Sequence, residues 1–310
     1  MEGSRRAIVA AFLANLGIAV AKLVGFLLTG AASLAAEAIH SFADTANQGL
    51  LFLGAERAKR APDATHPFGY GRERYFWAFV VALVLFSGGG LFALFEAEEK
   101  LRKPHELESL GVAVVILLVA VVLESLSLRT AAHESRAAKG DDSWREFVLH
   151  SKQAELPVVL LEDSGALIGL TFALAGVTLA SVTGNSRYDA LGSLGIGILL
   201  VVIAMTLATK MKSLLIGEAG SPTQVAAVQA AITDHPAVRR LVRLRTLQLG
   251  PEELMVIADV EFDSRLDGPA VAEAVDAVAD AVRTSVPEAR VVHLEPETTA
   301  EAEASAPTPG

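Results

Sequence analysis

Six long apolar segments constrain the fold of this 310-residue chain more than any other feature. A helix needs about 20 residues to cross the hydrocarbon layer of a bilayer. The segments long enough to do so are residues 7–29, 32–56, 75–96, 109–132, 156–183 and 188–210. Hydrophobic residues make up 52% of the chain and charged residues 20%, which is more apolar than an ordinary soluble domain. The sequence therefore predicts an all-α bundle of six transmembrane helices, the first too long to be a cleaved signal peptide.

The distribution of Lys and Arg predicts the orientation of these helices. Fourteen of them flank the first segment, fill the loops after the second and fourth segments, or follow the sixth, whereas the opposite loops carry four. Loops rich in Lys and Arg stay in the cytoplasm. We therefore expect a multi-pass protein of the cell (inner) membrane with both termini in the cytoplasm.

The composition changes after the sixth segment. Residues 217–310 hold 16 acidic and 7 basic side chains, a balance of −9 that accounts for nearly all of the chain's −10. A nucleic-acid partner is therefore not expected, because such proteins carry basic surfaces. We predict a transmembrane domain over 1–216, a cytoplasmic regulatory or dimerisation domain over 217–297 and a disordered tail over 298–310.

The pattern of residues 217–297 indicates an α+β domain. Ser221 and Gln224 form a capping box at the start of a helix. The strand-like runs LVRLRTLQL and ELMVIADVEF follow, then the amphipathic helix DGPAVAEAVDAVADAVRTSV and the strand ARVVHLEP. This αββαβ order suggests a ferredoxin-like domain of two layers.

Polar side chains interrupt the second apolar segment, which contains Glu37, His40, Asp44 and Asn47. Each Asp at the centre of a membrane helix costs about 2.5–3.5 kcal/mol, so such groups are expected to face something polar. His40 and Asp44 lie one turn apart on one face, where both can reach one divalent ion. The alternative is a hydrogen-bonded pair that only orders the bundle. The sequence contains no cysteine, so any metal must be held by nitrogen and oxygen.

Two ligands do not complete a metal site, so a second helix is expected to contribute. The fifth segment carries Glu162 and Asp163 in an apolar run. Adjacent helical residues point about 100° apart, so one of them can bind the ion while the other pairs elsewhere.

Other charged residues also fall in the apolar segments, among them Lys22, Glu124 and Asp189. Lys22 is expected to snorkel or to form an ion pair. Asp189 is interpreted as an N-cap or first-turn acid, and Glu124 as either a packing partner or a residue of an ion pathway. The glycines of SGGG and GSLGIG predict close approach of helices.

Taken together, the stretches EAIHSFADTANQGLL, HPFGYGRERY, VVLLEDSGALIG and YDALGSLGIG resemble the cation diffusion facilitators, and within them the branch that contains the animal mitochondrial zinc transporter 9. The resemblance covers about residues 7 to 297. It implies a homodimer that exports Zn²⁺ or a similar ion from the cytoplasm in exchange for protons.

The resemblance also implies a ligand set. His40 and Asp44 match the first pair of the family's transport site, and Asp163 matches the second member of the other pair, whose first member is Val159 here. Glu162, Asn47 or water could supply the fourth ligand. Nitrogen and oxygen ligands suit Zn²⁺, but they also suit Mn²⁺, Fe²⁺ and Co²⁺.

Two other matches to the family are incomplete. Asp63 and His66 match a secondary metal site of some family members, but Tyr70 stands here where that site has a histidine. The alternative is that this loop is a structured turn without a metal. In the soluble domain, Asp259, His293 and Glu295 match positions of the family's regulatory metal cluster, and Val242 stands where that cluster has a histidine. The alternative is that these residues belong to a surface strand and bind no metal.

Two other functions stay open. A membrane metal sensor or scaffold would bind ions without turnover. A membrane-embedded metalloenzyme is less favoured, since no additional general base or nucleophile converges on the ligands in sequence.

Overall fold

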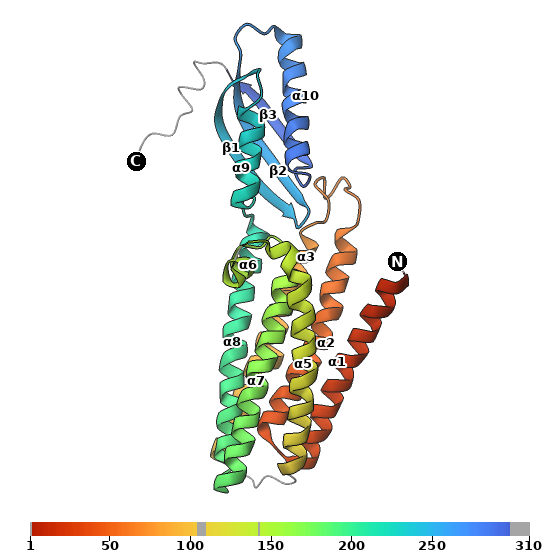
Figure 1. Ribbon diagram of the computed structural model, residues 1–310, viewed down its shortest axis with the longest axis vertical. Coiled ribbons are helices and arrows are strands. Elements are labelled where there is room, and N and C mark those ends of the chain that lie inside the picture. The colour runs from red at the N-terminus through yellow and green to blue at the C-terminus, as the bar shows by residue number, and fades with distance from the viewer. Residues whose placement is uncertain (1, 104–109, 142, 298–310) are drawn as a thin grey trace, which may run out of the picture. The chain divides into compact units, whose positions relative to one another are not determined.

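The computed structural model describes residues 2–103, 110–141 and 143–297. The predicted disordered tail lies outside these residues. The elements, shown in Figure 1, are α1 (Glu2–Thr29), α2 (Ala32–Ala58), α3 (Glu73–Val84), the π-helix η1 (Leu85–Leu91), α4 (Phe92–Arg102), α5 (Leu110–Lys139), α6 (Trp144–His150), α7 (Glu155–Thr183), α8 (Arg187–Ile216), α9 (Pro222–Thr233), β1 (Val238–Gly250), β2 (Glu253–Phe262), α10 (Gly268–Ser285) and β3 (Val291–Glu297).

These elements form two compact units. The first contains residues 1–57, 74–149 and 153–212, and the second contains 58–73, 150–152 and 213–310. The loop between α2 and α3 therefore belongs with the C-terminal unit, where Gly71 lies against Gly250 at the end of β1. A Cβ on Gly71 would come within 3.0 Å of the Gly250 Cα, so this close approach requires glycine.

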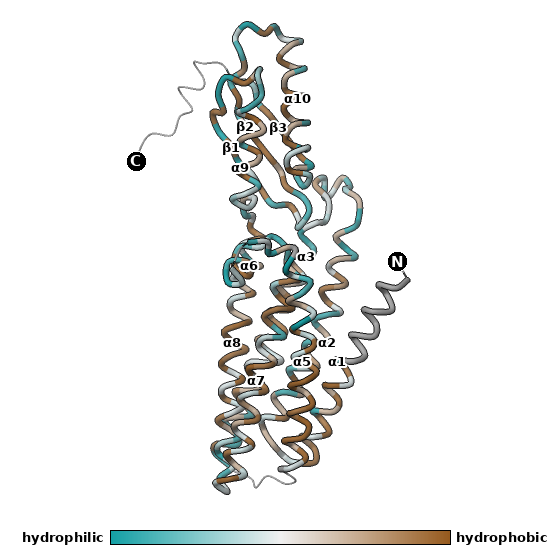
Figure 2. Tube along the Cα trace, viewed as in Figure 1, coloured by the Kyte–Doolittle hydropathy of each residue, from teal (hydrophilic) through white to brown (hydrophobic). Residues whose placement is uncertain are grey.

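Four helical stretches of the first unit are long and apolar enough to cross a membrane. They are Glu73–Arg102, Gly111–Arg136, Glu155–Thr183 and Arg187–Ile216, and Figure 2 shows how apolar residues dominate α5, α7 and α8. Asn15–Thr29 in α1 is a shorter apolar helix, and the 27-residue α2 carries several charged residues. Four of the six predicted spans are thus helices with the length and apolarity that a membrane span needs, and the count of six spans stays a prediction.

The third predicted span is an α-helix that changes to a π-helix at LFSGGGL and back again. Its glycines do permit close packing, as expected. A Cβ on Gly90 would lie 2.8 Å from Val201 Cγ2, and one on Gly197 of α8 would lie 2.8 Å from Leu94. Gly88, in contrast, faces open space.

Asp189 is a first-turn acid of α8, as predicted, and it has a second role. Its buried carboxylate caps α2, accepting hydrogen bonds from Ala32 N at 2.6 Å, from Ser33 N at 3.2 Å and from the Ser33 hydroxyl. These residues lie more than 150 positions apart in sequence. The first N–H groups of a helix lack intrahelical partners, so Asp189 fixes the start of the helix that carries His40 and Asp44.

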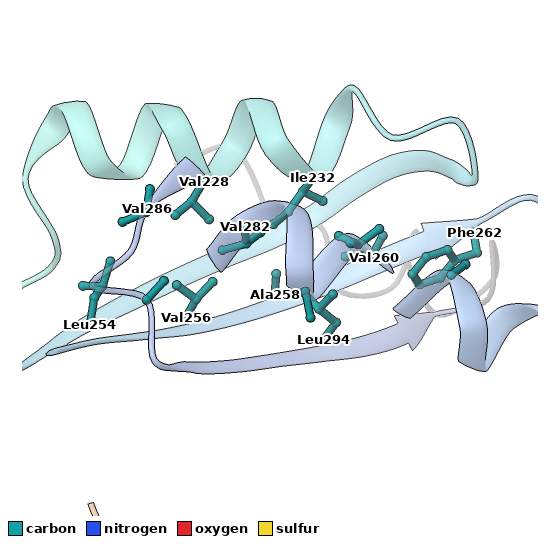
Figure 3. Close-up of a cluster of buried hydrophobic side chains, with 14 residues drawn as sticks. Val228, Ile232, Leu254, Val256, Ala258, Val260, Phe262, Val282, Val286 and Leu294 are labelled. Carbon is teal, nitrogen blue, oxygen red and sulfur yellow. The ribbon is translucent and has the colours of Figure 1, made fainter. Parts of the chain in front are cut away.

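The C-terminal unit has the predicted αββαβ order. Ser221 and Gln224 form the predicted capping box. β1 pairs with β2 antiparallel, and β2 pairs with β3 parallel. Figure 3 shows the core, in which the predicted alternating face of β2 packs with residues of α9 and α10; its members include Val228, Ile232, Val256, Ala258, Val260, Phe262, Val278 and Val282.

Candidate functional site

His40 and Asp44 lie together on α2 as their spacing predicts. His40 is fully buried, and its Nε2 lies 3.6 Å from Asp44 Oδ2. Among the described residues, neither ring nitrogen of His40 has a hydrogen-bond partner, and Asp44 Oδ1 has none either. Buried polar atoms are nearly always hydrogen-bonded, so these unpaired atoms are expected to bind a group that fills the site.

The adjacent acids of α7 have different partners, in accord with the angle between neighbouring helical residues. Glu162 is buried, and its Oε1 accepts a hydrogen bond of 2.6 Å from Asn47 Nδ2 of α2. Asp163 Oδ2 accepts a hydrogen bond of 2.9 Å from the Ser127 hydroxyl of α5. Asn47 Oδ1 has no partner among the described residues. Contacts across α2, α5 and α7 therefore orient both acids.

A small cavity lies between these helices. Its lining consists of Asn15, Ser41, Asp44, Gln48, Glu124, Val159, Glu162 and Asp163. The cavity volume is about 10 Å³, close to the lower limit of about 10–15 Å³ for one water molecule.

The predicted ligands are only partly brought together. Asp44, Glu162 and Asp163 line the cavity, while His40 is placed through its contact with Asp44 and Asn47 through its contact with Glu162. Within the described residues, no three His, Cys, Asp or Glu side chains are arranged to hold one metal ion.

Lys22 connects a second set of buried acids to this region. Its ammonium group lies 2.7 Å from the Ser41 hydroxyl, 3.1 Å from Glu37 and 3.5 Å from Glu124. The prediction of an ion-paired lysine is confirmed. Glu124 is buried and lines the cavity. Sequence periodicity could place Glu37 near His40, but it could not assign Lys22 to an acid on α5.

The Asp63 loop forms a closed hydrogen-bonded turn. Asp63 accepts bonds from the backbone N–H groups of Thr65 and His66 and from the Tyr70 hydroxyl. The Tyr70 hydroxyl, together with the backbone donors, holds the pKa of Asp63 below its ordinary value. The same bond raises the pKa of Tyr70. The geometry favours the turn interpretation over a metal site, which stays a prediction.

The predicted regulatory cluster lies on two neighbouring strands. Asp259 is buried and paired with Arg243, while His293 and Glu295 lie on β3, where Glu295 is the register partner of Asp259. Since Arg243 already neutralises Asp259, the arrangement favours the surface-strand interpretation.

The long apolar helices, with several acids buried among them, are those of a multi-pass membrane protein. Residues 8–216 match the cation efflux transmembrane domain. The chain belongs to the cation efflux family, whose members are transporters and not enzymes, and it lies near the branch of the proton-coupled zinc antiporters SLC30A9.

Three relatives illustrate the similarity. The chain is 35% identical over 269 residues to the protein named proton-coupled zinc antiporter SLC30A9, mitochondrial, of Xenopus laevis. The aligned region covers 86% of this chain and 48% of that protein. The Homo sapiens protein of the same name is 35% identical over 248 residues, covering 79% and 44%. The cation-efflux pump FieF of Klebsiella pneumoniae is 26% identical over 294 residues, covering 94% and 92%. The chain thus spans about half the length of the first two relatives.

Proposed function

We propose that this protein is a proton-coupled antiporter that exports divalent cations, Zn²⁺ first among them, from the cytoplasm. The observation that carries the proposal is the cavity where Asp44 of α2 meets Glu162 and Asp163 of α7. Burial of several carboxylates in one membrane domain is costly unless a cation offsets their charge. The similarity to proteins named zinc antiporters supports the choice of ion and of protons as the counter-ion.

In this proposal His40, Asp44 and Asp163 bind the cation directly, and Glu162 or Asn47 assists. Neither ring nitrogen of His40 has a hydrogen-bond partner in the part of the chain that the structure describes, and the ring lies beside Asp44, so both side chains can bind a cation that enters there. Nitrogen and oxygen ligands also admit Mn²⁺, Fe²⁺ and Co²⁺.

Proton coupling follows from ligand chemistry. An imidazole or a carboxylic acid must lose its proton before it can bind a metal, so cation binding releases protons and protonation releases the cation. If helices rock about a midplane site, this exchange can take place alternately on the two sides of the membrane. The same residues would then carry both fluxes.

The wider assembly is part of the proposal. Six spans over 1–216 would place both termini in the cytoplasm of a cell (inner) membrane protein, and a ferredoxin-like regulatory or dimerisation domain over 217–297 would join two copies into a homodimer. The Lys and Arg distribution supports this orientation, and the αββαβ order supports the domain type.

The test measures Zn²⁺-dependent proton movement in proteoliposomes for the wild type, Asp44→Ala and Asp163→Ala. We expect flux in the wild type and none in either variant. Glu98→Ala is the control, because Glu98 is exposed and pairs with Arg102 on α4; it should transport normally. Absence of flux with Zn²⁺, Mn²⁺, Fe²⁺ and Co²⁺, in folded protein that still binds metal, would overturn the transporter proposal and favour the sensor or scaffold.

A further inference from the structure

Glu124 is an acid of the cavity that the predicted ligand set does not include. It lies on α5, is 7% exposed and lines the same small cavity as Asp44, Glu162 and Asp163. α5 also packs along α7, which carries two of these acids. A third helix therefore contributes a carboxylate to the site.

Lys22 holds Glu124 more loosely than its other partners. The Lys22 ammonium lies 2.7 Å from Ser41 Oγ and 3.1 Å from Glu37 Oε2, but 3.5 Å from Glu124 Oε1. The last distance is at the outer limit of a hydrogen bond, so this contact is the weakest of the three. If Glu124 turned away, Lys22 would keep two partners and its charge would remain neutralised by Glu37.

One position in the lining of the cavity carries an aliphatic side chain where a donor is expected. Val159 lines the cavity at the α7 position where the family resemblance implies a ligand, and an aliphatic side chain cannot bind a cation. Glu162 is already engaged by Asn47 at 2.6 Å. His40 is fully buried and faces Asp44. Among the described residues, neither of its ring nitrogens has a hydrogen-bond partner, so α2 offers atoms that can still bind a cation.

We propose that Glu124 is a further ligand of the transported divalent cation, supplying from α5 the donor that Val159 cannot supply from α7. The proposal rests on the proposed function and extends its site. In the absence of the cation Lys22 holds the Glu124 carboxylate; when the cation enters, the carboxylate turns to the cation while Lys22 stays with Glu37 and Ser41. Lys22 thus acts as an internal substitute for the cation.

The test compares Zn²⁺ affinity and ligand number in purified full-length protein in detergent micelles, by calorimetry and by X-ray absorption at the zinc edge. Glu124→Gln keeps an oxygen that can accept the Lys22 hydrogen bond but removes the charge. We expect Glu124→Gln to weaken Zn²⁺ binding at least about tenfold. The absorption spectrum should show one oxygen or nitrogen ligand fewer around the zinc, and the thermal unfolding midpoint should not change. Glu124→Gln is also measured in a Lys22→Met background, in which Glu124 has no ammonium group to neutralise; a cation ligand should still weaken Zn²⁺ binding there when it is replaced.

The two backgrounds separate a ligand from a structural counter-ion. If Glu124 only neutralises Lys22, Glu124→Gln will leave Zn²⁺ binding unchanged in the Lys22→Met background, and the proposal is overturned. It is also overturned if Glu124→Gln binds Zn²⁺ like the wild type while Asp44→Asn does not; in that case the proposed function stands. A wild type that binds no Zn²⁺ would instead refute the proposed function. If Glu124→Gln does not fold, Glu124→Asp provides the same comparison, because it keeps the charge on a shorter side chain. A Zn²⁺ affinity of Glu124→Asp equal to that of the wild type would contradict a direct ligand.

Discussion

Replacing Asp189 by alanine should destabilise the membrane domain by about 3 kcal/mol. Its carboxylate accepts three hydrogen bonds at the start of α2, from Ala32 N, Ser33 N and the Ser33 hydroxyl. A helix cap contributes about 1 kcal/mol, and a hydrogen bond to a charged group contributes about 1.5–3 kcal/mol. Because Ala32 and Ser33 are fully buried, the N–H groups left behind could not turn to solvent.

The measurement is reversible unfolding of the purified protein by SDS in mixed micelles, followed by circular dichroism. Asp189→Asn keeps one acceptor oxygen and should lose about half as much stability, and Ser33→Ala, which removes one of the three bonds, about 1 kcal/mol. A loss below about 0.5 kcal/mol for Asp189→Ala would refute the argument that this carboxylate fixes the start of α2. Zn²⁺ affinity should fall in parallel, because α2 carries His40 and Asp44.

Three further predictions follow from particular contacts. Gly90→Ala should destabilise the protein by about 1–3 kcal/mol, because its Cβ would lie 2.8 Å from Val201 Cγ2, whereas Gly88→Ala should be tolerated because nothing lies near its Cβ; equal thermal unfolding midpoints would contradict this packing. Arg265 and a backbone N–H lower the pKa of Asp263 to about 2, so this group stabilises the fold above its unfolded pKa of about 3.9 and ceases to do so as the pH falls towards 2; carboxyl-carbon NMR of Arg265→Gln should show the Asp263 pKa rise towards 3.8, and an unchanged value would refute the assigned cause. His66→Ala should leave the Zn²⁺ stoichiometry in calorimetry unchanged, since Asp63 is engaged by Thr65, His66 and Tyr70 in a turn; loss of one bound ion would favour the metal-site interpretation.

The apolar segments and the soluble domain could be predicted because their signals are local. Segment length and composition identify the four stretches that form helices long and apolar enough to cross a membrane. The capping box at Ser221 and the alternating face of β2 depend on residues within a few positions of one another. The short helix α6 was not predicted, because seven residues are too few for a periodic signal.

The candidate site could be predicted only along a single helix. A spacing of four residues places His40 beside Asp44, and adjacency alone indicates that Glu162 and Asp163 diverge. Spacing within α7 says nothing about which of these acids meets Asn47 and which meets Ser127.

The tertiary structure decided the pairings between helices. Asp189 caps α2 from the start of α8, Lys22 of α1 lies between acids of α2 and α5, and Glu124 enters the cavity of the predicted ligands. Each of these contacts depends on how whole helices are rotated and shifted against one another. That arrangement is set by the close packing of many side chains at once, and no repeat in the sequence encodes it.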